Sequence, residues 1–225
     1  MIPEKSDTIY YSKFTAVFTS LLFVGLVAAS PADDKKSPSK EELKKQQQAF
    51  EAFAKPGKPH RELRKLVGRW KGEVTMYDPS DPKNGIMSKS TGTAIFRPLM
   101  GGRFVQQVWR GKMAGQPFVG MGISGYDNSK KKYVSTWIDN FGTGIMNSTG
   151  TYDEKTKTIT EIGTASTPQG DLKLKTIIKY TDADHFQLTM FMVSPKGSHK
   201  MMEIQYTRDK SFKPPQRKKR VKKAK

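Results

Sequence analysis

The sequence predicts an all-β protein, a closed, antiparallel, up-and-down β-barrel of about ten strands with one N-terminal helix. From residue 63 onward, apolar and polar residues alternate in short segments rich in β-branched and aromatic residues, which is typical of strands. The connections are hairpin-sized and rich in Gly, Pro, Asn and Asp, so none is long enough for a parallel crossover. Closure into a barrel removes the two edges that an open sheet of this size would expose.

The chain of 225 residues suits one domain with appendages. We divide it into a signal segment (1–29), a polar spacer (30–60), the barrel (61–209) and a basic tail (210–225). The net charge is +19, and the last sixteen residues carry +9 of it. Cysteine is absent from the sequence, which excludes disulfides, thiolate nucleophiles and thiolate metal sites.

The N-terminal segment has the order of a secretory signal peptide. A polar start containing Lys5 and Lys13 is followed by an apolar run over 14–29, and Val27 and Ala29 fit a small-x-small cleavage site. Cleavage would leave Ser30 as the first residue, so we expect a protein exported to the periplasm, cell envelope or exterior. The alternative is an uncleaved membrane anchor, although the run is shorter than the roughly 20 residues of a spanning helix.

The spacer contains one segment with helical character. Ser39 and Glu42 have capping-box spacing, and Leu43, Phe50 and Phe53 fall near one face, which predicts a helix over 40–54. The sequence KPGKP at 55–59 is expected to end it. Such a helix either plugs or flanks the barrel, or forms a solvated stalk.

The strands of the barrel follow in ten segments. They are expected at 70–77, 88–96, 103–110, 118–126, 133–139, 145–152, 158–165, 172–180, 186–193 and 201–208.

Several motifs in this region resemble the bacterial family called domain of unknown function 1579. The resemblance covers roughly residues 42–208 and rests on PGKPH at 56–60, LVGRW at 66–70, GGRF at 101–104, GQPF at 115–118, KKYVSTWIDN at 131–140 and GTYD at 150–153. It implies a calycin-like barrel related in shape to lipocalins and nitrobindins. It implies no established activity, so function has to be argued from the residues.

A small-molecule binding module is the function class that this pattern favours. Small barrels enclose either packed side chains or a ligand cavity. Alternation places Tyr133, Ser135, Trp137 and Asp139 on one face of a strand, and we expect this face to be interior. The predicted site for a small, partly polar ligand comprises Trp70, Arg103, Gln107, Trp137, Asp139 and Met146.

Two alternatives to this site stay open. Arg103 follows two glycines and could enter the barrel to pair with a ligand, or form an internal pair with Asp139 that only orients the barrel floor. The methionines of the strands form either an adaptable cavity lining or an ordinary core.

The sequence shows no catalytic constellation and no metal site. The three histidines, His60, His185 and His199, have no second ligand at metal-binding spacing and are read as turn residues. No cofactor is expected, but the resemblance to nitrobindins keeps open a haem-binding or enzymatic barrel, with His185 or His199 as axial ligand.

The tail supports an alternative function, an interaction protein tethered to envelope polyanions. Its basic residues cannot bury apolar surface and are attracted to anionic polymers or lipid headgroups. Specific nucleic-acid recognition is not expected, because the tail lacks aromatic residues interleaved for base stacking. The predicted polyanion-binding residues are Arg217, Lys218, Lys219, Arg220, Lys222, Lys223 and Lys225.

Overall fold

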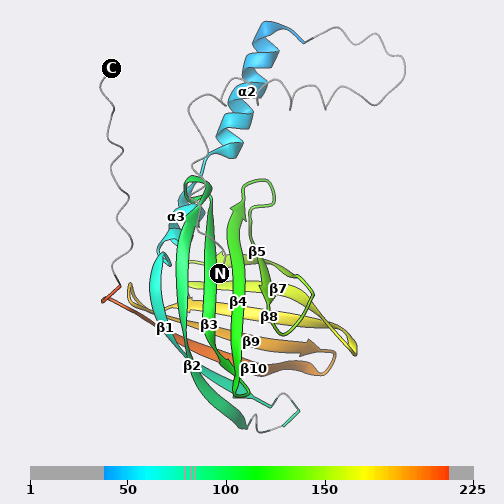
Figure 1. The fold of residues 1–225 in the computed structure, drawn as a ribbon. Helices are drawn as coiled ribbons and strands as arrows, with labels where there is room; N and C mark the ends of the chain where they lie inside the picture. Colours follow the sequence, from blue (N-terminus) through cyan, green and yellow to red (C-terminus); the bar gives the residue numbers. More distant parts are fainter. Residues whose placement is uncertain (1–37, 79, 82, 84, 213–225) are drawn as a thin grey trace. The chain divides into compact units, whose positions relative to one another are not determined.

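The computed structural model describes residues 38–212 apart from positions 79, 82 and 84. It divides into two units, 1–48 and 49–225, and the second contains the whole barrel. Ten antiparallel strands wrap into a closed barrel (Figure 1). The fold class that the sequence predicts is therefore confirmed.

Two helices precede the first strand. Helix α2 (Lys40–Ala54) occupies the predicted range. Its capping box is formed, since Ser39 N–H donates to Glu42 Oε2 at 2.7 Å and Glu42 N–H donates to Ser39 Oγ at 3.3 Å. None of its residues is buried. No helix in the described part of the chain is long and apolar enough to cross a membrane.

Helix α3 (Lys58–Arg64) was not predicted, because KPGKP at 55–59 was expected only to end the preceding helix and His60 was expected to lie in a turn. Pro59 lies in the first turn, where its missing N–H costs no intrahelical hydrogen bond. His60 Nδ1 accepts a hydrogen bond from Gly57 N–H at 3.0 Å and thereby caps the helix start. His60 and Leu63 are buried, so tertiary packing holds a helix too short to be stable alone.

The ten strands form an up-and-down meander in which each pairs with its sequence neighbour and β1 pairs with β10 to close the barrel. All ten lie where the sequence predicts them, and most are longer by one to four residues at an end. The strands are β1 (Gly68–Tyr77), β2 (Ile86–Leu99), β3 (Phe104–Met113), β4 (Gln116–Asp127), β5 (Lys132–Asp139), β6 (Met146–Asp153), β7 (Thr158–Thr167), β8 (Gly170–Tyr180), β9 (His185–Ser194) and β10 (Gly197–Arg208).

One end of the barrel is closed by a packed core. Helix α3 packs against β3, β4 and the 3-10 turn η1 (Met100–Gly102), which joins β2 to β3. Large side chains fill the barrel below this helix, and Phe186 stacks on Tyr206 with ring centroids 4.2 Å apart. The buried members of this core include Leu63, Leu66, Trp70, Phe96, Val105, Tyr133, Ile159, Phe186 and Tyr206. The strands extend beyond this core, so the opposite end of the barrel is available for a cavity.

Candidate functional site

The barrel is hollow at the end away from α3. The cavity has a volume of about 460 Å³, within the range of ligand pockets, and is lined by inward-facing residues of the strands. Its mouth lies among the connections between strands and carries exposed apolar side chains, including Phe141 and Ile145. Six methionines contribute to the wall: Met76, Met113, Met146, Met190, Met201 and Met202.

Two tryptophans line the cavity, and glycines on neighbouring strands leave space for their rings. A Cβ atom at Gly72 or Gly92 would overlap the indole of Trp109. A Cβ atom at Gly120 would overlap the indole of Trp137. Both rings therefore lie against the sheet instead of filling the lumen, and this placement keeps the cavity open.

Strand β5 supplies the polar wall that the sequence predicts. Ser135, Trp137 and Asp139 all line the cavity, while Tyr133 on the same face belongs to the closed core. Trp137 Nε1–H donates to Asp139 Oδ2 at 3.0 Å, and Phe141 N–H donates to Asp139 Oδ1 at 2.9 Å. Both carboxylate oxygens of Asp139 thus accept hydrogen bonds from the protein itself. These bonds orient the Trp137 ring and the start of the loop that follows β5.

A buried glutamate on β7 lies on the cavity floor, and the sequence analysis missed it. Glu161 is 8% exposed and lines the cavity, and its Oε2 accepts a hydrogen bond from Ser135 Oγ at 2.9 Å. Burial raises the pKa of Glu161, and the hydrogen bond from Ser135 offsets part of this shift. Alternation along β7 gave a usable signal, because Glu161 shares the inward face with the buried residues Ile159 and Gly163.

We expect Glu161 to make stability depend on pH. Because its pKa is raised in the folded state, the unfolded chain loses the proton first, and stability falls as pH rises above the ordinary value of 4.5. Glu161→Gln should remove this loss, so thermal unfolding from pH 4 to 8 should show the variant increasingly more stable than wild type. Glu73→Gln, at an exposed position, is the control. Equal pH slopes in Glu161→Gln and wild type would refute the assignment.

A second polar pair lies on the opposite side of the cavity. Gln107 Nε2–H donates to the Tyr206 hydroxyl at 3.3 Å, and both residues line the cavity. Burial raises the pKa of Tyr206, so its hydroxyl stays protonated at physiological pH. The pair provides a neutral hydrogen-bonding position beside Trp109.

The structure brings together four of the six predicted ligand-site residues. Gln107, Trp137, Asp139 and Met146 line the cavity, although their role in binding stays a prediction. Arg103 lies outside: it precedes the first residue of β3, its side chain is exposed, and its Nη1–H donates to the Met100 carbonyl at 3.3 Å. The predicted alternatives for Arg103, a ligand contact inside the barrel or a pair with Asp139, are therefore both wrong.

Trp70 is the second correction, because it belongs to the closed end and not to the cavity. It is 2% exposed, its Nε1–H donates to the Leu66 carbonyl at 2.7 Å, and its ring meets Phe186 edge-on. The Arg208 guanidinium lies 4.1 Å from the centre of the Trp70 ring. Trp70 is thus part of the packing that closes the barrel.

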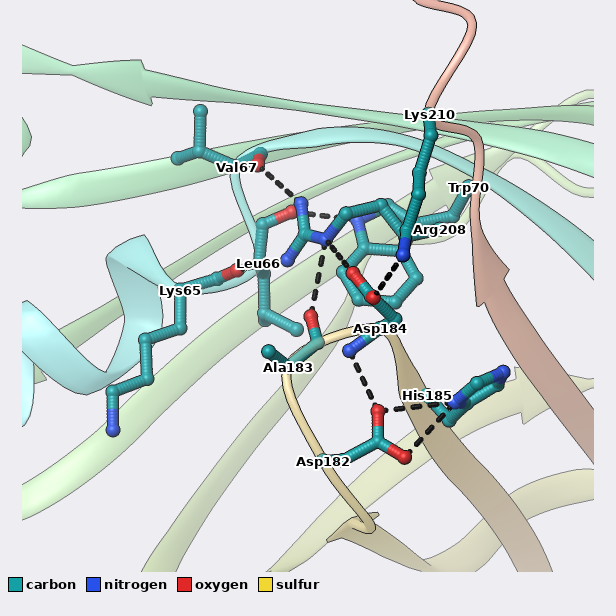
Figure 2. Close-up of polar contacts among 10 residues, drawn as sticks. All are labelled: Lys65, Leu66, Val67, Trp70, Asp182, Ala183, Asp184, His185, Arg208 and Lys210. Carbon is teal, nitrogen blue, oxygen red and sulfur yellow. Dashed lines mark hydrogen bonds and ion pairs between the residues drawn. The ribbon is translucent and has the colours of Figure 1, made fainter.

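Figure 2 shows the polar contacts that surround Arg208 at this end. Its guanidinium donates to the carbonyls of Lys65, Val67 and Ala183 at 2.7, 2.9 and 3.0 Å. Asp184 Oδ1 lies 3.3 Å from Arg208 Nε. One side chain therefore joins the last strand, the β8–β9 turn and the segment that connects α3 to β1.

The histidines lie outside the cavity lining. His60 is buried in α3, where burial lowers its pKa, which corrects its reading as an exposed turn residue. His185 is exposed, with Nδ1 3.0 Å from the Asp182 carboxylate (Figure 2). His199 is half-buried on β10. Within the described ranges, no group of three or more His, Cys, Asp or Glu side chains could hold a metal ion.

The predicted signal segment (1–29) and the polyanion-binding residues of the tail lie outside the described residues. Export and tail binding remain predictions from sequence.

Comparisons with known proteins identify the family. The family model described as "Protein of unknown function (DUF1579)" matches residues 55–208, and no curated protein matches the sequence. The S-type phycobiliprotein lyase CPES from Guillardia theta aligns with a TM-score of 0.47 and 9% identity over 68% of this chain and 94% of that chain. A redesigned β-barrel aligns with a TM-score of 0.34 and 16% identity over 66% and 96%. Neither neighbour bears on what the cavity binds.

Proposed function

The chain belongs to the DUF1579 family of proteins of unknown function, and from its hollow barrel we propose that it binds a small, mostly apolar molecule with a polar group. This proposal rests on one observation: small residues occupy many inward-facing positions of the strands. Ser90, Ser124, Ser135, Ser148 and Ala165 all line the cavity. Larger apolar side chains at these positions would fill the lumen and bury more apolar surface. The interior of a small barrel is usually packed in that way.

The lining suits such a ligand in two ways. Methionine and tryptophan side chains supply an apolar wall, and methionine adapts its shape to a ligand. Glu161 with Ser135, and Gln107 with Tyr206, place a few polar groups at separate points of that wall. A mostly apolar cavity with a few placed polar groups is the general composition of small-molecule sites.

Filling the cavity tests the proposal. Ser90 and Thr91 are neighbours on β2, with Ser90 lining the cavity and Thr91 exposed. We expect Ser90→Phe to weaken binding of the uncharged fluorescent probe N-phenyl-1-naphthylamine by about tenfold or more, because the added ring occupies the lumen at a cost above about 1.4 kcal/mol. Thr91→Phe adds the same ring outside and should bind as wild type does.

Thermal unfolding of both variants would confirm that the barrel is intact. The proposal fails if wild type does not bind the probe, or if the two phenylalanine variants lose binding equally.

A further inference from the structure

We infer that the cavity takes an amphipathic amine head first, with the protonated nitrogen held by the Glu161 carboxylate on the floor and the apolar chain directed to the mouth. This inference rests on the proposed function and names the class of its ligand. Glu161 and Ser135 lie on the floor, and the apolar walls lead from there to the mouth.

The depth of Glu161 follows from strand register. It is the fourth residue of β7, which starts at the closed end, and it lies opposite Gly150 on β6 and Thr176 on β8. A Cβ atom at Gly150 would come 2.7 Å from Glu161 Cγ, so glycine at this position leaves room for the glutamate side chain beside the wall. The carboxylate is thus placed next to the closed core and away from the rim.

The cavity is acidic, opposite in sign to the chain as a whole. Its lining contains three charged residues, Lys112, Asp139 and Glu161. Lys112 is exposed near the end of β3, at the mouth. Asp139 uses both oxygens in hydrogen bonds to Trp137 and Phe141. Glu161 is therefore the charged group of the deep cavity that is available to a ligand.

Among the described residues, Ser135 is the one whose side chain donates a hydrogen bond to the Glu161 carboxylate, and it does so at Oε2. A carboxylate taken out of water is unfavourable without a partner of opposite charge. A ligand ammonium would supply that partner and could donate to Oε1 as well. An alcohol would supply a hydrogen bond without the charge, and a carboxylate head would be repelled.

The apolar part of the ligand has a continuous path outward. Leu174, Met146, Met190 and Met202 line the cavity around and above the floor, and Phe141 and Ile145 are 51% and 64% exposed at the mouth. An unbranched or aromatic chain attached to the amine would bury its surface along this path. The polar head at the bottom and the apolar rim at the top together set the direction of entry.

The test compares three ligands with the same chain and different heads: decylamine, decanol and decanoate. Binding to the full-length protein at pH 7 would be measured by displacement of N-phenyl-1-naphthylamine and by native mass spectrometry. We expect decylamine to bind at least about tenfold more tightly than decanol, and decanoate to bind most weakly. Glu161→Gln should bring decylamine to within about threefold of decanol, because the amide has no charge to hold the ammonium. Glu73→Gln should keep the wild-type order.

Two results would overturn the inference. Equal affinity for decylamine and decanol in wild type, or a preference for the amine that survives in Glu161→Gln, would show that Glu161 does not select the head group while cavity binding itself stands. Absence of binding for all three ligands and for the probe would overturn both the inference and the proposed function.

Discussion

Replacing Arg208 with methionine is expected to lower the free energy of unfolding by about 2–4 kcal/mol. The guanidinium donates to three backbone carbonyls, those of Lys65, Val67 and Ala183, and lies over the Trp70 ring. Methionine keeps part of the stacked volume and removes every donor. Hydrogen bonds from charged groups contribute more than neutral ones, although partial exposure of this side chain reduces their effect.

Chemical denaturation followed by tryptophan fluorescence would measure this loss. Arg110→Met is the matched control, because Arg110 is exposed on β3 and its replacement should change stability by no more than about 0.5 kcal/mol. Arg208→Lys should recover only a minor part of the loss, since an ammonium has no planar fork to reach the three carbonyls together. If Arg208→Met is as stable as Arg110→Met, Arg208 does not hold the closed end together.

Replacing Gly92 with alanine is expected to destabilise the barrel by about 1–3 kcal/mol and to push Trp109 toward the cavity. The added methyl group would overlap the Trp109 indole and would lie 2.8 Å from the Arg110 carbonyl. The ring cannot retreat along the sheet, because Gly72 and Gly111 also lie against it. Strain in the strands or rotation of the indole is the remaining response.

A double-mutant cycle with Trp109→Phe separates this clash from a general glycine effect. The atoms overlapped by the new methyl group belong to the part of the indole that phenylalanine lacks or places elsewhere. The double variant should therefore lose less stability than the sum of the two single losses, with an interaction free energy of about 1 kcal/mol or more. Additive losses would mean that Gly92 is required for some reason other than Trp109.

Local patterns in the sequence predict helix α2 and all ten strands of this protein. Capping chemistry at Ser39 and Glu42 predicts helix α2, and the period of two predicts all ten strands and the inward face of β5. These features depend on residues close together in the chain, so each segment carries its own evidence. Where a segment lacked regular alternation, as in α3, burial of His60 and Leu63 decided the conformation.

The residues of the candidate site could not all be predicted from the alternation of apolar and polar residues. Glu161 was missed because an acidic side chain on an inward face conflicts with the expectation of an apolar interior, and only closure of the barrel shows that it borders a cavity. Arg103 was misplaced because alternation applies within a strand, and this residue precedes β3 in a turn where Gly101 and Gly102 have φ values of 70° and 86°.

The sequence by itself determined the strands, their turns and which side chains share a face. Only the tertiary structure decided which residues from distant strands meet, as when Arg208 reaches Val67, 141 positions away, through the pairing of β1 with β10. It also decided that large side chains fill one end of the barrel while Ser90, Ser148 and their neighbours leave the other hollow. The physical reason is that alternation is a property of one strand, whereas register, barrel closure and the volume left inside are set by all ten strands together.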